Sequence, residues 1–305
     1  MLRYTLSRLV SVIPTLLLVM LITFLLVHAA PGGPFDNERT LPPEMQARLQ
    51  AAYGLDQPLW VQFGNYIGGL MQGDLGPSFR YPQSTVNELI GDAAPVSLLL
   101  GSLAFIVAVI FGSAAGILAA IRQNRATDHV LMTVAMTGIS VPAFVVAPLL
   151  VLLFAITLRW LPASGLSTPW HFILPVFALA LPTAAYVARL IRASMLEVLK
   201  GQFIRTARAQ GLSSRTLVLR YALKPALIPV VSYLGPAVAA LLSGSVVIEQ
   251  IFNIPGLGRL FIQSALNRDY TLVMGLVILY STLLVLLNLI VDLLYAVLDP
   301  RVRYR

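Results

Sequence analysis

The stretch TLVMGLVILYSTLLVLLNLIVDLLYAVL occupies residues 271–298 and carries a single charged residue, Asp292. A transmembrane helix needs about 20 consecutive, predominantly apolar residues to cross the hydrocarbon core of a bilayer. This stretch is longer than that requirement. It therefore predicts a membrane-spanning helix close to the carboxyl terminus.

Five more stretches of the chain meet the same test of length and apolar character. With the first, the predicted spans are Leu9–Ala30, Val96–Ala120, Val130–Leu158, Phe172–Leu190, Ala226–Ile248 and Thr271–Leu298. Charged residues make up only 11% of the chain, against roughly 25% in an average soluble domain. The first run follows Arg3 and Arg8, as in a signal peptide, but it exceeds the 7–15 apolar residues of one. We therefore expect an all-α, multi-pass membrane protein with six spans in a single domain, residues 1–305.

The basic residues indicate how these spans are oriented. With the amino terminus placed in the cytoplasm, cytoplasmic segments hold 15 of the 21 Lys and Arg residues, and external segments hold six. Such a bias is the usual sign of the cytoplasmic side. We therefore expect both termini in the cytoplasm. The net charge of +8 then reflects membrane topology, and no nucleic-acid partner is expected.

The segment 31–95 is the longest predicted loop, and it is external in this topology. Seven acidic residues against three arginines give it a net charge of −4. Two prolines precede a run that predicts a short helix over Pro43–Tyr53. Gly73, Gly76 and the prolines after them predict irregular chain. Loops of this length are more often functional than idle, so the segment is either a docking surface or a solvated cap.

Few residues inside the spans are candidates for chemistry. Asp292 and Glu249 form a possible intramembrane polar site, because ionisable residues in spans are functional candidates by default. The alternative for Asp292 is a role in helix packing. Gly112 and Gly116 form a small-residue pair that allows two helices to approach closely. The chain has no cysteine and three scattered histidines, so no metal site is expected.

The segment Ser194–Pro225 reads SMLEVLKGQFIRTARAQGLSSRTLVLRYALKP and lies between the fourth and fifth spans. Its apolar residues repeat at helical spacing and form a stripe: Leu196, Leu199, Phe203, Ile204 and Ala207. Gly211 fits a helix-ending position, and Ser213 or Ser214 can cap the helix that follows. The pattern predicts an amphipathic helix, a turn and a second helix at the cytoplasmic surface. Such a hairpin binds either lipid headgroups or a partner protein.

This segment resembles the cytoplasmic coupling loop of ABC importer permeases. Arg205-Thr206-Ala207 stands where the general signature has Glu-Ala-Ala, and the form Arg-Thr-Ala-Arg-Ala-x-Gly is typical of the peptide-permease branch. The rest of the chain resembles the B-type permease subunits of bacterial oligopeptide and dipeptide ABC importers. The segments that carry this likeness are Met1–Tyr4, Ala30–Phe35, Glu38–Glu44, Gly73–Phe79, Phe144–Leu150, Ala265–Tyr270 and Leu294–Pro300.

The resemblance implies a type I ABC importer permease fold in a bacterial inner membrane, with a coupling helix but no ATPase of its own. No G-x-x-x-x-G-K-[ST] motif occurs in the chain. ATP and Mg²⁺ would be bound by two cytoplasmic ATPase partners, and no cofactor by this chain. The other implied partners are a homologous second permease, a periplasmic or extracellular peptide-binding protein, a peptide substrate and membrane lipid. The residues implied in coupling are Phe203, Arg205, Thr206, Ala207, Arg208, Ala209 and Gly211.

Three alternatives remain at this point. Importers of dipeptides, nickel or glutathione share the same architecture, and the resemblance favours longer peptides. An ion-coupled secondary transporter fits poorly, because such carriers need ionisable residues near the middle of the membrane. An intramembrane enzyme fits poorly as well, since the chain contains neither H-E-x-x-H nor G-x-S-x-G.

Overall fold

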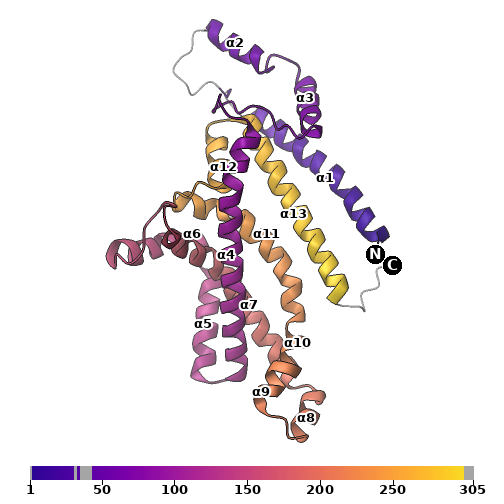
Figure 1. Ribbon diagram of the computed structural model, residues 1–305, viewed down its shortest axis with the longest axis vertical. Helices are drawn as coiled ribbons and strands as arrows, with labels where there is room; N and C mark the ends of the chain where they lie inside the picture. The colour runs from indigo at the N-terminus through magenta and orange to yellow at the C-terminus, as the bar shows by residue number, and fades with distance from the viewer. Residues whose placement is uncertain (1, 31–32, 35–42, 299–305) are drawn as a thin grey trace. The chain divides into compact units, whose positions relative to one another are not determined.

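The computed structural model describes residues 2–30, 33–34 and 43–298 (Figure 1). The described residues are helical, and their only β-type pairing is an isolated bridge between Pro77 and Thr85. Parts of the segments 30–35, 38–44 and 294–300, which contributed to the resemblance, lie outside the described residues. The chain divides into an N-terminal unit of residues 1–96 and 255–285 and a central unit of residues 97–254 and 286–305.

The N-terminal unit is built from two separate parts of the sequence, residues 1–96 and 255–285. Its helices are α1 (Leu2–Ala29), α2 (Pro43–Ala52), α3 (Leu59–Met71), the first turns of α4 (Val86–Ile121), α12 (Leu257–Leu266) and most of α13 (Tyr270–Leu298). Short helix α2 was predicted from the sequence, whereas α3 was not. The predicted loop 31–95 is also shorter than expected, because α4 begins at Val86 rather than at Val96.

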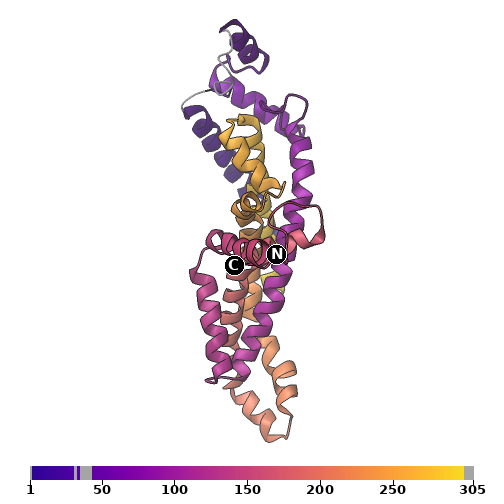
Figure 2. The same cartoon turned by 90° about the vertical axis from the view of Figure 1, so that its left-hand side faces the viewer.

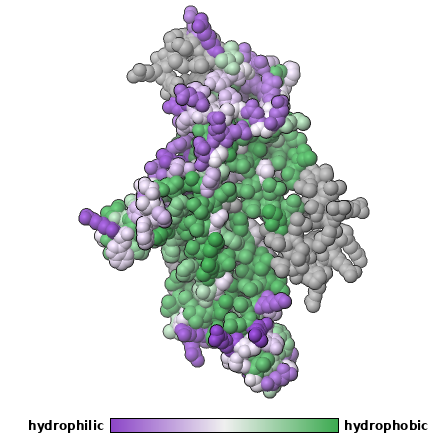
Figure 3. Space-filling model, viewed as in Figure 1, coloured by the Kyte–Doolittle hydropathy of each residue, from purple (hydrophilic) through white to green (hydrophobic). Residues whose placement is uncertain are grey.

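The central unit contains the end of α13, from residue 286 on, and the remaining helices. They are the rest of α4, α5 (Ala126–Ser140), α6 (Ala143–Leu150), η1 (Val151–Thr157), η2 (Pro169–Phe172), α7 (Ile173–Leu199), α8 (Gln202–Ala209), α9 (Ser214–Thr216), η3 (Leu217–Ala222), α10 (Leu223–Ala226) and α11 (Ile228–Ile251). Helices α5 and α7 lie side by side (Figures 1 and 2). Hydrophobic residues cover the sides of the long helices, and hydrophilic residues gather at the α8–α9 hairpin (Figure 3).

Four described helices are long and apolar enough to cross a membrane: Ser11–Ala29, Val86–Ile121, Pro169–Leu199 and Tyr270–Ile290. Two bent helix pairs meet the same criterion when each pair is counted as one span, which gives up to six spans among the described residues. The structure thus contains the helical content expected from the sequence. It also shows that two of the predicted spans are not straight.

The predicted span 130–158 is broken by a bend of 108° between α5 and α6. Val141 is extended, with φ −91° and ψ 119°, and Pro142 follows it. Proline disfavours helical backbone in the residue before it and has no N–H to donate to a helix. The predicted span therefore corresponds to a bent pair of helices, which meets the criterion for a membrane span only when the pair is counted together.

A milder bend of 52° separates residues 214–226 from α11. Pro225 and Pro229 flank the break, so two backbone donors are missing within a few residues. Helix α10 lies directly before the break, and η3, which precedes α10, forms a π-helical turn. The chain therefore leaves the α8–α9 hairpin through a non-uniform helix before α11 begins.

Helices α4 and α7 approach each other at two glycines. A Cβ added at Gly112 would lie 2.5 Å from the carbonyl oxygen of Ala184, and one added at Gly116 would lie 2.5 Å from that of Ala188. Real side chains do not tolerate such distances. The small-residue pair predicted from the sequence therefore allows the backbones of α4 and α7 to touch.

Candidate functional site

The α8–α9 hairpin of the central unit is the first candidate site. Helix α8 ends in a paired hydrogen-bond motif: Gly211 N donates to the Arg208 oxygen at 3.0 Å and Leu212 N to the Ala207 oxygen at 3.4 Å. Gly211 has φ +83°, the left-handed conformation that this helix ending requires. After the turn, the Ser213 hydroxyl accepts the backbone N–H of Thr216 and caps α9. The helix–glycine–helix arrangement and the serine cap were predicted from the sequence.

One face of α8 is anchored in the core of the central unit. Ile204 is fully buried and Ala207 is 5% exposed. Ile204 shares its apolar cluster with residues of α4, α7, η3, α10 and α11, among them Ile191 and Met195 of α7. The hairpin is therefore joined to the long helices by continuous apolar packing, and its position depends on theirs.

The other face of α8 is exposed. The exposed candidates are Phe203, Arg205, Thr206, Arg208, Ala209 and Gly211. Of the residues in the apolar stripe, Phe203 is 49% exposed, whereas Ile204 faces inward. The stripe does not lie on one continuous helix, because α7 ends at Leu199 and α8 begins at Gln202. A surface with one large apolar ring beside two arginines suits contact with a partner protein.

An ion pair with a buried carboxylate lies near the same hairpin, and it was not predicted from the sequence. Asp128, in the first turn of α5, is 1% exposed, and it accepts hydrogen bonds from Arg192 Nε at 2.6 Å and Nη2 at 2.8 Å. The backbone N–H of Asn124 donates to the same carboxylate at 2.9 Å. This two-point contact fixes the orientation of the guanidinium. Because Arg192 lies on α7 shortly before α8, the pair ties the start of α5 to the helix that carries the hairpin.

Of the two residues in the predicted intramembrane polar site, only Glu249 has a described side chain. Glu249 lies on α11 and is fully buried, and the hydroxyl of Ser97 on α4 donates to it at 2.7 Å. This contact joins two helices of the central unit. Asp292 lies on α13, but its side chain is outside the described part of the chain. No group of three or more potential metal ligands occurs among the described residues.

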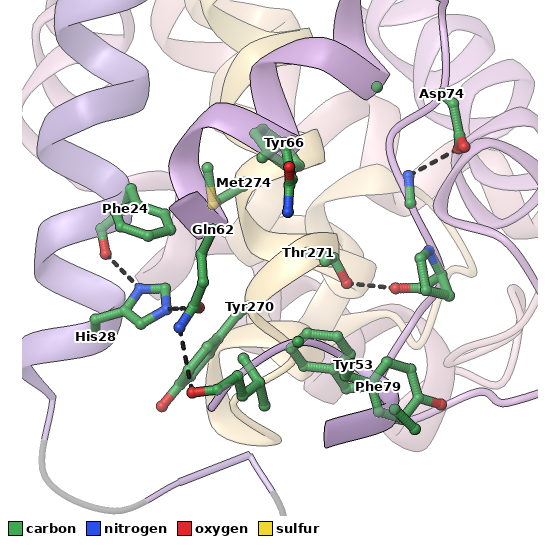
Figure 4. A pocket seen from close by; sticks show the side chains of 17 residues that line it. Phe24, His28, Tyr53, Gln62, Tyr66, Asp74, Phe79, Tyr270, Thr271 and Met274 are labelled. Carbon is green, nitrogen blue, oxygen red and sulfur yellow. Dashed lines mark hydrogen bonds between the residues drawn. The ribbon is translucent and has the colours of Figure 1, made fainter. Parts of the chain in front are cut away.

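The N-terminal unit contains a second candidate, a cavity of about 340 Å³ (Figure 4). Its walls come from α1, the end of α2, α3, the segment after α3 and the start of α13. The main wall side chains are Phe24, His28, Tyr53, Tyr66, Phe79 and Tyr270. The cavity was not predicted from the sequence, because its rings are spread over residues 24–79 and Tyr270 and carry no motif.

Comparison with known proteins places the chain in a family. Residues 112–304 match the family of binding-protein-dependent transport system inner membrane components, and residues 1–100 match the N-terminal domain of such components. The first match covers more than half of the chain. The chain belongs to this family. This permease is accordingly a multi-pass inner membrane protein.

Several relatives of this permease match over its full length. It is 50% identical over 306 residues to the oligopeptide transport system permease protein OppB of Haemophilus influenzae, with both chains fully covered. It is 51% identical over 310 residues to the protein of the same name from Escherichia coli, again with full coverage of both. A dipeptide transport system permease protein of Bacillus subtilis is 42% identical and is matched over 98% of its length.

Two solved structures confirm the fold of this permease. An amino acid ABC transporter with histidines superposes with a TM-score of 0.55 at 20% identity, covering 68% of this chain and 94% of the other. An inward-facing MetNI methionine ABC transporter gives 0.57 at 17% identity, covering 69% and 96%. The predicted all-α, type I ABC permease fold is confirmed by these likenesses. At such low identity they bear on the fold alone.

Proposed function

We propose that this permease is a pore-forming subunit of an ATP-driven importer of oligopeptides. The observation that carries the proposal is the identity of 50% and 51%, over the full length of both chains, to two oligopeptide transport system permeases. Relatives named for dipeptide and glutathione transport are less similar, at 42% and 43%. The choice of longer peptides over these two substrates rests on that difference.

ATP hydrolysis belongs to partner subunits in this proposal. The full complex contains this chain, a homologous second permease, two cytoplasmic ATPases that bind ATP and Mg²⁺, and an external peptide-binding protein. The chain itself needs no cofactor. The predicted outer loop 31–95, with its net charge of −4, is the candidate surface on which the peptide-binding protein docks.

The α8 helix is the proposed coupling element. Its exposed face, with Phe203, Arg205 and Arg208, would contact an ATPase, while buried Ile204 joins it to α7. Since the contact between Ile204 and the core is apolar and continuous, a displacement of α8 by the ATPase moves α7 with it. The two-point contact between Arg192 and Asp128 carries the same displacement to α5. Alternating access then follows from the movement of these helices.

The orientation of the chain follows from the same proposal. If α8 meets a cytoplasmic ATPase, the hairpin and both termini face the cytoplasm, and residues 43–85 face outward. The division of basic residues, 15 against six, agrees with this arrangement. Single cysteines test it without background, because the chain has none. In intact cells, an impermeant maleimide should label Gln57→Cys and leave Arg303→Cys unlabelled, and the reverse result would overturn the orientation.

Uptake by the reconstituted complex tests the function. The four membrane and ATPase subunits are placed in liposomes, with the binding protein on the outer side and a radiolabelled pentapeptide as substrate. We expect uptake that requires ATP, is blocked by vanadate and is insensitive to a proton uncoupler. Uptake abolished by the uncoupler but not by vanadate would instead identify an ion-coupled carrier. Uptake of a dipeptide in preference to the pentapeptide would contradict the proposed substrate class.

A further inference from the structure

The cavity of the N-terminal unit has the size of a small-ligand site. Its volume of about 340 Å³ falls within the range of roughly 300–1,000 Å³ that is usual for such pockets. That space accommodates one large amino-acid side chain together with its own backbone. It does not accommodate a longer peptide in full.

The walls of the cavity are aromatic and are held in place by contacts between rings (Figure 4). The centroids of Phe24 and His28 lie 4.1 Å apart, and those of His28 and Tyr270 lie 4.9 Å apart. Tyr53 and Phe79 meet edge to face at 4.9 Å. Preformed aromatic walls of this kind favour an aromatic or large aliphatic side chain, which gains area burial and ring contacts together.

Polar groups in the wall divide into those with a partner and one without. Gln62 bonds to His28 Nε2 at 3.2 Å and donates to the Gln57 oxygen at 2.7 Å. The buried Tyr66 hydroxyl has no hydrogen-bond partner within the described parts of the chain. Burial raises the pKa of Tyr66 above its ordinary value, so the phenol remains a neutral donor. An unpaired buried donor costs about 1–3 kcal/mol, and a hydrogen bond to a ligand carbonyl, formed after a change in the χ1 angle of Tyr66, would remove that cost.

A negative charge lies at the edge of the cavity. Asp74 is an exposed lining residue, and one of its carboxylate oxygens accepts the backbone N–H of Gly76 at 2.9 Å. Among the described residues that line the cavity, Asp74 is the only Asp, Glu, Lys or Arg. A ligand with a cationic group beside an apolar side chain therefore complements the site. The amino-terminal residue of a free peptide combines these features with a carbonyl acceptor.

We propose that this cavity binds the amino-terminal residue of a free peptide. The side chain occupies the aromatic walls, the carbonyl accepts the Tyr66 hydroxyl, and the ammonium group faces Asp74. This proposal rests on the proposed function and deepens it, because it assigns a peptide contact to the permease itself.

The test measures binding of radiolabelled Phe-Gly-Gly to the full chain in lipid nanodiscs by equilibrium dialysis, without other subunits. Saturable binding is expected. N-acetyl-Phe-Gly-Gly, which lacks the ammonium charge, and Gly-Gly-Gly, which lacks the ring, should each bind at least tenfold more weakly. The variant Asp74→Asn should weaken binding of Phe-Gly-Gly but leave that of the acetylated peptide unchanged. Equal binding of all three peptides would overturn the proposal.

A matched pair of substitutions localises the binding. Ala52 is exposed and lines the cavity, whereas its neighbour Ala51 is exposed and does not. Ala52→Trp should therefore fill the cavity and abolish binding, and Ala51→Trp should leave it intact. Equal loss in both variants, or no loss in either, would place the binding elsewhere and overturn the proposal. Capture of the purified binding protein without any binding of Phe-Gly-Gly would also overturn it, in favour of a protein segment as occupant.

The failure of this proposal is distinguishable from failure of the proposed function. Normal ATP-dependent uptake of a pentapeptide with no saturable binding of Phe-Gly-Gly refutes the cavity site alone. Binding that depends on Ala52 and Asp74, in a complex that imports no oligopeptide, refutes the proposed function and supports the cavity site.

Discussion

Two regions of this permease leave the long helices and return to them, and they are attached in opposite ways. The α8–α9 hairpin is anchored by an apolar side chain, Ile204, which is part of the core formed by the long helices. The segment 43–85 is anchored by a carboxylate, Asp269, directly before α13. Asp269 accepts the Ser78 hydroxyl at 2.5 Å and the backbone N–H groups of Phe79 and Arg80 at 3.2 Å each.

The difference between these anchors indicates what each region does. Apolar packing is non-directional, so the hairpin and α7 can shift together without losing their contact. Hydrogen bonds to a buried carboxylate need defined distances and angles, so the segment 43–85 keeps one shape next to its cavity. The first attachment suits transmission of movement, and the second suits recognition. Four substitutions test this contrast, from the largest expected effect to the smallest.

Asp269→Ala should have the largest effect on stability. It removes the acceptor of several buried donors, each of which costs about 1–3 kcal/mol when unpaired, so a loss of roughly 4 kcal/mol is expected. Denaturant unfolding in detergent measures this loss, and limited proteolysis should cleave within residues 72–85. Asp74→Ala is the control, since that carboxylate is exposed and should change stability by less than about 1 kcal/mol. Equal effects would show that Asp269 is not the anchor.

Ile204→Ala should cost about 3 kcal/mol, because it leaves a cavity in the core around α7. Under the proposed coupling, transport-stimulated ATP hydrolysis should fall while the ATPases still bind. The neighbouring Phe203→Ala is a matched control, since Phe203 is half-exposed. It should leave stability unchanged and weaken ATPase association in a pull-down. If the two variants behave alike, α8 has no distinct inner and outer faces.

Gly211→Val should cost about 1–3 kcal/mol, because a β-branched residue is strained at φ +83°. A Cβ at this position has open space within 4 Å, so the effect isolates backbone strain from steric overlap. Membrane insertion should be intact, and substrate-stimulated ATPase activity of the reconstituted complex should drop strongly. Gly211→Asn is the control, since asparagine tolerates the left-handed conformation and should retain most activity. Full coupling in Gly211→Val would exclude this turn from force transmission.

Arg192→Lys should have the smallest effect, roughly 1 kcal/mol. Lysine keeps the positive charge but cannot make the two-point contact with Asp128. Coupling should weaken partially, measured as fewer peptides transported per ATP hydrolysed. Arg189→Lys, one turn away and positioned 5.4 Å over the ring of Tyr186, is the matched control and should be near neutral. An identical response of both variants would argue against a role for the ion pair.

Local patterns in the sequence predicted much of this structure. Apolar runs located the long helices, Gly112 and Gly116 indicated the close helix approach, and Gly211 indicated the left-handed turn. Each of these signals depends on residues that are neighbours in the chain. The likeness of the whole chain to peptide permeases supplied the family, which the comparisons confirmed.

Features that depend on distant residues were missed. Asp128 and Arg192 are 64 positions apart, and Ser78 and Asp269 are 191 apart, so spacing in the sequence says nothing of their contacts. Helix α3 was missed because its glycines resemble those of irregular chain. Pro142 indicates a kink in its apolar run but does not fix the angle, so the bend of 108° was not predicted.

The glycine contact between α4 and α7 restricts how these helices can slide. Moving α4 along α7 by one turn, about 5.4 Å, would place Ala108 or Ala120 opposite the carbonyl that now faces a glycine. Either alanine carries the Cβ for which the present geometry leaves 2.5 Å. A ratchet of one helix past the other is therefore blocked in both directions. Helices α4 and α7 are therefore expected to move together as one rigid pair.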